Sequence, residues 1–303
     1  MYPTPQLFWP RLAERCASEV WVKHENHLPT GSFKVRGGVT YVAALARSEL
    51  GTDTVVAATR GNHGQSVAWA AARAGLRAEI VVPFGNSATK NAAMRAYGAT
   101  LIEHGGDFQA AYEFARKMAD ERGYHFFPSF HPTLVRGVSS YAMELFARVA
   151  DLDTLYVPIG LGSGICGAIA AREAMGLRTR IVGVVSDRAP AYALSFAAGR
   201  PVETDSADTI ADGIACRVPD ADAVEVINRY AERIVAVSDE EIKRSIACYF
   251  TDTHNVAEGA GAAALAALLK ERETMRGKRV AVVLTGGNID TELYRDALRS
   301  IEQ

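Results

Sequence analysis

Lys34 is the residue of this chain that is best placed for covalent chemistry. It stands between the apolar residues Phe33 and Val35, at the expected start of a helix and inside a segment bounded by glycines. Most lysine side chains are solvated surface charges. An amine that lies among apolar groups loses its proton more readily, and the neutral amine can form a Schiff base with a carbonyl compound. The segment therefore predicts a reactive lysine.

The turn at residues 59–64 (TRGNHG) could hold an anion. It lies between an expected strand and an expected helix, and the first N–H groups of a helix favour an anionic group such as a carboxylate. Gly61 lets a ligand come close to the backbone, while Asn62 and His63 add side-chain donors. A plain turn with an asparagine N-cap explains this motif equally well when it is taken alone.

A second turn, at residues 158–167 (PIGLGSGICG), is rich in glycine and directly follows an expected strand. Its glycines, the hydroxyl of Ser163 and the start of the next helix together favour a bound phosphate group. A dinucleotide would also need an acidic residue at the end of the next strand, and residues 181–185 (IVGVV) end without one. We therefore expect a phosphate monoester at this turn.

A third turn, at residues 284–290 (LTGGNID), places the hydroxyl of Thr285 at the end of an expected strand. A hydroxyl in that position could contact a bound ligand. The alternative is a glycine turn in which Asp290 caps the last helix.

These motifs belong to an alternating pattern of strands and helices. Near-continuous apolar strands that alternate with helices are typical of mostly parallel, twisted sheets with helices on both faces. We therefore predict an α/β fold whose ligands bind beyond the carboxyl ends of the strands. The expected strands are residues 54–59, 78–83, 100–104, 154–158, 180–185, 234–237 and 279–284. The expected helices include residues 62–74, a helix from the N-cap Ser87 to Tyr97, a helix from the N-cap Asp107 to about Arg122, and the alanine-rich residues 260–269.

The composition excludes several classes of function. A net charge of −2 gives no electrostatic footprint for nucleic acid or for an anionic membrane. We find neither a secretory signal nor a run of about 18 apolar residues that could span a bilayer. The four cysteines are far apart, so we expect reduced thiols in a cytoplasmic protein, without a metal or redox site.

Taken together, six stretches resemble the serine/threonine dehydratase family of fold-type-II (tryptophan-synthase-β-like) pyridoxal-phosphate enzymes. In chain order they are GSFKVRGG, TRGNHGQS, PIGLGSGICG, TIADGIA, AEGAGAAAL and LTGGNID, and they span residues 31–290. The resemblance implies pyridoxal 5'-phosphate as the cofactor, a homodimer, and two domains. Residues 1–55 and 134–303 would form the large cofactor-binding domain, and residues 56–133 the small substrate-gripping domain.

The resemblance also implies roles toward the cofactor. Lys34 would carry it in a Schiff base and act as the catalytic base. Phe33 would pack against the pyridine ring with Gly213 close by, and Thr285 would meet the pyridine nitrogen. Because a hydroxyl does not compel that nitrogen to be protonated, prompt loss of a β-substituent would be favoured over a long-lived carbanion. The remaining cofactor residues would be Asn62 on the ring hydroxyl, Glu258 near the cofactor or in a structural role, and, around the phosphate, Gly160, Leu161, Gly162, Ser163 and Gly164.

The substrate would be bound by the first turn. The resemblance implies that Thr59, Asn62 and His63 hold the substrate carboxylate. The full set of expected substrate-binding residues is Thr59, Arg60, Gly61, Asn62 and His63.

Three positions narrow the expected chemistry. Arg60 stands where dehydratases and serine racemases often have a serine, and an arginine, which stays protonated, is a poor acid/base group for racemisation. Arg60 could instead pair with a second substrate carboxylate, as in 3-hydroxyaspartate, or form a structural ion pair. Relatives that replace a β-substituent have a threonine at the position of His63, so the histidine argues against that reaction. Val185 stands where metal-activated relatives have a glutamate ligand, so we expect no divalent-cation site.

We therefore expect a lyase that converts L-threonine, L-serine or both to a 2-oxo acid and ammonia. The alternatives are a dehydratase for L-threo-3-hydroxyaspartate or another hydroxy amino acid, a serine racemase-like enzyme, an enzyme that replaces the β-substituent, and a binding protein without catalysis. The chain stops about one helix after the third turn, so we expect no C-terminal regulatory domain.

Overall fold

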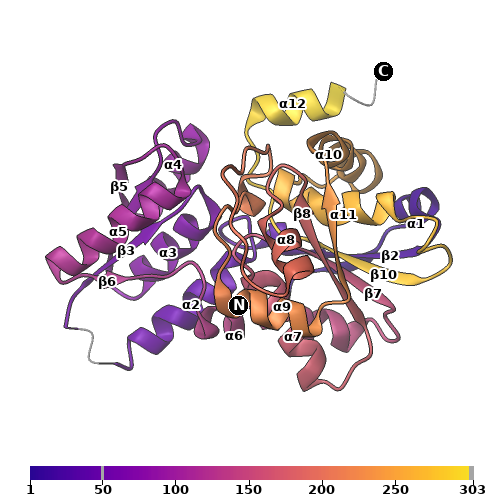
Figure 1. The fold of residues 1–303 in the computed structure, drawn as a ribbon, viewed down its shortest axis with the longest axis horizontal. Helices are drawn as coiled ribbons and strands as arrows, with labels where there is room; N and C mark the ends of the chain where they lie inside the picture. Colours follow the sequence, from indigo (N-terminus) through magenta and orange to yellow (C-terminus); the bar gives the residue numbers. More distant parts are fainter. Residues whose placement is uncertain (49–50, 300–303) are drawn as a thin grey trace. The chain divides into compact units, whose positions relative to one another are not determined.

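The computed structural model of the chain describes residues 1–48 and 51–299. Contacts divide the chain into two compact units, a first unit of Met1–Phe33 and Val138–Gln303 and a second unit of Lys34–Gly137. Each unit is built on its own sheet, and Figure 1 labels the helices and strands. Nearly all strand pairs are parallel, which confirms the predicted α/β fold.

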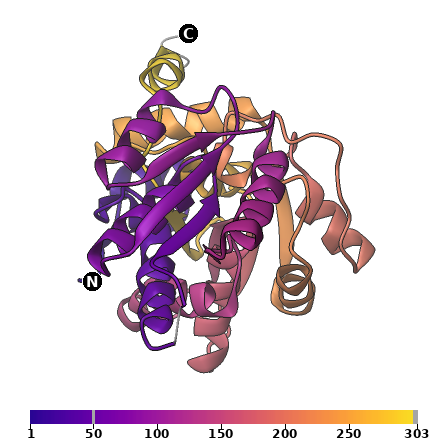
Figure 2. The same ribbon diagram turned by 90° about the vertical axis from the view of Figure 1, so that its left-hand side faces the viewer.

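The second unit has a parallel sheet in the order β5-β4-β3-β6, and Figure 2 turns it toward the viewer. Successive side chains of a strand face opposite sides of the sheet. Val55 and Ile80 therefore pack in one apolar cluster, whereas Val56 and Val81 pack in another with residues of α5. Helices on both faces thus explain why β3 and most of β4 are apolar. The bounds are β3 (Thr54–Ala58), β4 (Arg77–Val82), β5 (Thr100–Glu103), β6 (His125–Phe126), α2 (Lys34–Leu45), α3 (Asn62–Arg73), α4 (Ala88–Ala96) and α5 (Phe108–Arg122).

The first unit has a six-stranded sheet in the order β1-β2-β10-β7-β8-β9, in which only β1 is antiparallel to its neighbour. Its strands are β1 (Gln6–Phe8), β2 (Glu19–His24), β7 (Thr154–Pro158), β8 (Arg180–Ser186), β9 (Arg233–Val237) and β10 (Arg279–Leu284). Its helices are α1 (Pro10–Cys16), α7 (Ser163–Ala174), α8 (Ala191–Ala198), α9 (Ala221–Tyr230), α10 (Asp239–Thr253), α11 (Gly259–Lys270) and α12 (Thr291–Arg299), and α6 (Pro132–Arg148) starts in the second unit and ends in this one. The alanine-rich α11 is buried from Gly259 to Leu268, as predicted, because its small side chains let it lie within the core.

Local signals in the sequence give accurate element bounds. β7 and β10 have the predicted bounds, and the other predicted strands agree with the structure to within about one residue at either end. Two predicted N-caps, Ser87 and Asp107, are confirmed, whereas the N-cap of α3 is Gly61 and not Asn62. The Ser87 side chain accepts a hydrogen bond from the Lys90 N–H (3.2 Å), and the Asp107 side chain accepts one from the Ala110 N–H (2.8 Å).

The N-terminal boundary of the second unit differs from the expected one. The sequence predicts a small domain at residues 56–133, whereas the contacts also assign α2 to the second unit. The reason is that α2 packs closely on α3. A Cβ atom on Gly38 would lie 2.2 Å from Ser66 Oγ, and that hydroxyl donates to the Lys34 carbonyl (2.8 Å).

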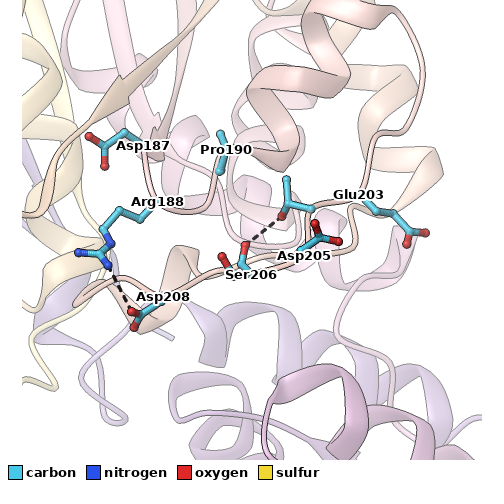
Figure 3. A pocket seen from close by; sticks show the side chains of 8 residues that line it. Asp187, Arg188, Pro190, Glu203, Asp205, Ser206 and Asp208 are labelled. Carbon is cyan, nitrogen blue, oxygen red and sulfur yellow. Dashed lines mark hydrogen bonds and ion pairs between the residues drawn. The ribbon is translucent and has the colours of Figure 1, made fainter.

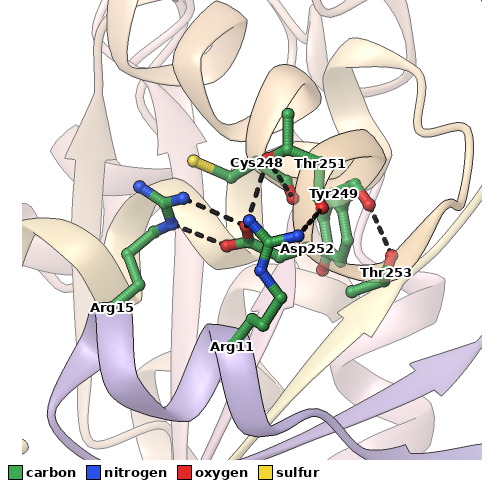
Figure 4. Close-up of polar contacts among 7 residues, drawn as sticks. All are labelled: Arg11, Arg15, Cys248, Tyr249, Thr251, Asp252 and Thr253. Atoms are coloured by element: carbon green, nitrogen blue, oxygen red, sulfur yellow. Dashed lines mark hydrogen bonds and ion pairs between the residues drawn. The ribbon is translucent and has the colours of Figure 1, made fainter.

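Ion pairs attach the N-terminal helix of the first unit to α10 (Figure 4). Arg15 donates to both carboxylate oxygens of Asp252 (2.6 and 3.0 Å), and Arg11 donates to the Thr251 carbonyl (2.7 Å). Burial would raise the pKa of Asp252, but its hydrogen bonds with Arg15 hold it below the usual value. Asp252 is therefore a charged structural group. None of the described helices combines the length and apolar character needed to cross a bilayer.

Candidate active site

Lys34 is the first residue of α2, as its sequence context predicts. The four residues that follow it are all buried, and its carbonyl is held by Ser66. Burial lowers the pKa of the Lys34 amine to about 8. The positive end of a helix also disfavours a cation in the first turn. A minor fraction of this amine is therefore neutral, and nucleophilic, at pH 7, far more than for an ordinary exposed lysine.

The turn between β3 and α3 is closed by the side chain of Thr59. Thr59 Oγ1 accepts hydrogen bonds from the N–H groups of Gly61 (2.9 Å) and Gly64 (3.2 Å), and only 2% of the residue is exposed. Its two lone pairs are thus engaged within the turn, and its O–H remains the group that can donate to a ligand. The expected substrate residue Thr59 therefore shapes the turn that carries the other four.

The other expected substrate residues follow Thr59 directly. Gly61 is the N-cap of α3, Asn62 is the first residue of that helix, and Arg60 and Asn62 are partly buried. His63 is buried, and its ring lies edge-on to Phe127 with 5.6 Å between the ring centroids. Burial, and to a lesser degree the charge of Lys34, lower the pKa of His63 to about 3. His63 is therefore a neutral imidazole near Lys34.

In the first unit, the glycine-rich turn connects β7 to α7. Gly162 is the N-cap of α7 and has φ = 96°, a left-handed conformation that favours glycine. A Cβ atom on Gly160 would lie 2.3 Å from the Gly213 carbonyl oxygen, so the two backbones are in contact. The first N–H groups of a helix lack intrahelical acceptors and bind anions. The expected phosphate residues, Gly160, Leu161, Gly162, Ser163 and Gly164, all lie in this connection.

The third turn lies beside the segment that precedes the lysine. The Phe33 N–H donates to the Thr285 carbonyl (3.0 Å), and Ser32 pairs with Gly286. The Glu258 N–H in turn donates to the Gly286 carbonyl (3.1 Å). This unit thus brings the segment of Phe33 together with two motifs that lie more than 200 residues further along the chain.

The Phe33 ring also reaches the glycine-rich turn between β7 and α7, which is the expected phosphate turn. A Cβ atom on Gly164 would be in van der Waals contact with that ring, at 3.5 Å. Tyr141 supports the same position, because its ring lies edge-on to Phe33 and its O–H donates to the Gly164 carbonyl (2.9 Å). Phe33 therefore lies at the phosphate turn, where the resemblance places it against the cofactor.

The residues present fit pyridoxal phosphate. The first unit supplies a left-handed glycine followed by a helix start, which suits a phosphate monoester. It also holds Ser32 Oγ, which is buried and has no hydrogen-bond partner among the described residues. The second unit supplies an amine with a lowered pKa, which suits an aldehyde.

Some contacts around these residues are not predictable from the sequence. Phe127 follows the two-residue strand β6 and contacts His63 through its ring, and Tyr141 lies in the middle of α6. Neither residue stands in a motif. Their only sequence signal is an apolar or aromatic residue in an element that covers a sheet.

A hollow lies elsewhere in the first unit (Figure 3). It has a volume of about 710 Å³, and Arg188 donates to Asp208 (3.3 Å) at its rim. Val185, which stands where metal-activated relatives would have a glutamate ligand, is buried within β8. Among the residues that the structure describes, no group of three or more His, Cys, Asp or Glu side chains is arranged to hold a metal ion. The hollow contains none of the expected site residues and is lined by Asp187, Arg188, Pro190, Glu203, Thr204, Asp205, Ser206 and Asp208.

Thr59→Val should destabilise the protein more than Thr59→Ser. Valine removes the acceptor of two N–H groups in a buried turn, which costs about 2 kcal/mol of unfolding free energy. Serine keeps the acceptor and loses one buried methyl group, which costs roughly 1 kcal/mol. Urea unfolding of the two variants measures the difference. Equal losses would show that the hydroxyl does not hold the turn.

The chain is similar to known proteins over nearly its whole length. A family model described as pyridoxal-phosphate dependent enzyme matches residues 1–286. The L-threonine ammonia-lyase of Thermotoga maritima is 36% identical over 93% of this chain and 70% of its own length. The L-threonine dehydratase biosynthetic IlvA of Pasteurella multocida is 32% identical over 96% of this chain, which spans only 57% of that relative.

A solved structure shows the same fold over nearly the whole chain. The processed form of threonine deaminase isoform 2 from Solanum lycopersicum superimposes with a TM-score of 0.91, at 26% identity, over 98% of this chain and 87% of that one. The family model covers far more than half of the residues. The chain thus belongs to the family of pyridoxal-phosphate-dependent enzymes.

Proposed function

We propose that this enzyme is an ammonia-lyase that removes water and ammonia from a β-hydroxy amino acid, above all L-threonine and L-serine, and yields a 2-oxo acid. The observation that carries the proposal is the buried amine of Lys34, whose lowered pKa suits both covalent capture of an aldehyde and proton transfer. The similarity to a threonine ammonia-lyase and a threonine dehydratase over more than nine-tenths of the chain supports it.

Residues of several motifs would hold the cofactor. Lys34 would bind its aldehyde carbon, and the phosphate would accept hydrogen bonds from the turn at residues 160–164. Phe33 would pack on the ring, and Thr285 would place its hydroxyl at the pyridine nitrogen. The other residues of this set are Asn62 at the ring hydroxyl, Gly213 beside the ring, and Glu258 near the cofactor or as a structural group.

The protein's own groups would then carry out the elimination. Bound pyridoxal phosphate supplies an electron sink that makes the α-proton of the amino acid acidic. Lys34, as a neutral amine, accepts that proton. The neutral hydroxyl of Thr285 would keep that sink weak, which favours prompt departure of the β-hydroxyl. The α-proton and the β-hydroxyl would together be lost as one molecule of water. The released enamine takes up water and gives the 2-oxo acid and ammonia.

Lys34→Ala should abolish both cofactor attachment and catalysis. We expect a loss of the borohydride-reducible linkage, together with a fall of at least about 10²-fold in 2-oxo-acid release from L-threonine. Visible absorbance and a coupled 2-oxo-acid assay measure the two effects. Lys117→Ala, which changes an exposed lysine of α5, is the control and should match the wild type. Wild-type protein that releases no 2-oxo acid from either hydroxy amino acid would overturn the proposed function.

Arg60 bears on a second candidate function, dehydration of L-threo-3-hydroxyaspartate. An arginine in the substrate turn could pair with a second carboxylate, a contact worth roughly 1.5–3 kcal/mol. Arg60 is, however, partly buried and its Nε atom is fully enclosed. We therefore propose that it mainly stabilises the turn, and that it does not act as an acid/base group for racemisation.

Arg60→Ser should thus lower the thermal unfolding midpoint and leave the ratio of kcat/KM between L-threonine and 3-hydroxyaspartate within about twofold. Wild-type enzyme should form no D-serine from L-serine, as chiral chromatography would show. A wild-type preference for 3-hydroxyaspartate that the variant removes, by about tenfold or more, would make Arg60 a specificity residue instead.

Four buried cysteines bear on the cellular compartment. All four thiols are free, and burial raises the pKa of Cys16, Cys166 and Cys216 to about 12. Unreactive thiols without disulfides are typical of a reducing compartment. We propose the cytoplasm, which cell fractionation can test.

We also propose that the enzyme is a homodimer. The edge strand β1 exposes two large apolar side chains, Leu7 (44%) and Phe8 (43%), next to unpaired backbone groups. Light scattering of the eluted wild-type protein should give twice 32.6 kDa. Leu7→Lys with Phe8→Lys should give a monomer, whereas the control Phe84→Lys, at an exposed apolar residue of the second unit, should not. A monomeric wild-type protein would contradict this proposal.

A further inference from the structure

Tyr141 of α6 lies against the first turn of α7. The residue is 1% exposed, and its O–H donates to the Gly164 carbonyl (2.9 Å). One turn away on both helices, α6 also packs on Gly167, where an added Cβ atom would lie 3.0 Å from the Ser139 nitrogen and 3.1 Å from Val138 Cγ1. Two contacts therefore hold α6 against α7, and they fix the position of the Tyr141 hydroxyl.

The ring and the hydroxyl of Tyr141 make different contacts. The ring lies edge-on to Phe33, with 6.4 Å between the centroids and an interplanar angle of 73°. The hydroxyl binds the backbone of α7 at Gly164. A phenylalanine at residue 141 would keep the first contact and lose the second, so the two can be separated by experiment.

The hydrogen bond from Tyr141 is additional to the helix pattern. In an α-helix each carbonyl accepts from the N–H four residues later, which pairs Gly164 with Ala168 in α7. A carbonyl oxygen has two lone pairs, and the phenol uses the second one. The helix thus does not need Tyr141 to satisfy this carbonyl.

Tyr141 acts on a peptide unit at the start of α7. The Gly164 carbonyl and the Ile165 N–H belong to the same peptide unit, and a hydrogen bond to the oxygen polarises that unit and makes its N–H a stronger donor. The hydrogen bonds of α7 have begun by Cys166, whose N–H donates to the Gly162 carbonyl (3.0 Å). The Ile165 N–H precedes that bond, and the first N–H groups of a helix bind anions.

We propose that Tyr141 is a positioning residue that raises the affinity of the glycine-rich turn for a phosphate monoester. Its hydroxyl holds the Gly164 carbonyl and strengthens the Ile165 N–H as a donor, and it acts without touching the ligand. This inference rests on the proposed function and on the part that it gives to residues 160–164 as the site of the cofactor phosphate.

The test compares two probes that differ only in the phosphate, pyridoxal 5'-phosphate and pyridoxal. The Kd of each for the apoenzyme is read from visible absorbance, for the wild type and for Tyr141→Phe. The matched control is Tyr156→Phe, which removes another buried hydroxyl of the first unit. That hydroxyl donates to Glu271 (2.6 Å), which caps the C-terminal end of α11.

We expect Tyr141→Phe to raise the Kd of pyridoxal 5'-phosphate by about fivefold and to leave the Kd of pyridoxal within about twofold. Tyr156→Phe should lower the thermal unfolding midpoint and leave both Kd values within about twofold. A purely structural role of Tyr141 would weaken both probes alike, because both present the same ring and aldehyde.

Equal losses for the two probes, or unchanged Kd values for both, would overturn the inference. A Tyr141→Phe protein that binds neither probe would also overturn it, because Tyr141 would then be a residue of the fold. Wild-type protein that binds pyridoxal as tightly as pyridoxal 5'-phosphate would overturn it as well. None of these results touches the proposed function, which fails only if the wild-type holoenzyme releases no 2-oxo acid from L-serine and L-threonine.

Discussion

The burial of a single amine, that of Lys34, is the constraint on which the proposed chemistry of this enzyme depends. An ordinary exposed lysine is almost wholly protonated at neutral pH and cannot attack an aldehyde. Here burial lowers the pKa to about 8. The start of α2 lies tightly against α3, where Ser66 Oγ donates to the Lys34 carbonyl and only a glycine fits at residue 38.

Parallel sheets explain why the remaining groups gather as they do. The three turns follow β3, β7 and β10, and all carboxyl ends of parallel strands point to the same edge of their sheet. In the first unit, the glycine-rich turn and Thr285 both lie beside Phe33: a Cβ atom on Gly164 would be 3.5 Å from its ring, and its N–H donates to the Thr285 carbonyl (3.0 Å). Lys34 directly follows Phe33 in the chain, so the position of Phe33 limits where the lysine backbone can lie.

The sequence predicts local features better than long-range ones. The N-caps Ser87 and Asp107 depend on neighbouring residues only, and both are confirmed. The assignment of α2 to the second unit depends on its packing on α3, which no local pattern encodes. The role of Thr59 as the acceptor of two N–H groups depends on the exact path of the backbone. A sequence motif identifies such residues, but the donor and the acceptor of each hydrogen bond are known only from the three-dimensional structure.

The central claim is that Lys34 binds the cofactor, and two other buried lysines, Lys23 and Lys90, offer a direct contrast. Lys23 donates to Glu144 (2.6 Å) and to the Thr4 carbonyl (2.9 Å), which suits a charged structural group. The most direct test is reduction of the holoenzyme with borohydride, followed by digestion and mass spectrometry. The account predicts that the reduced cofactor is found on the peptide that contains Lys34. A cofactor mass on the peptide of Lys23 or Lys90, with Lys34 unmodified, would contradict it.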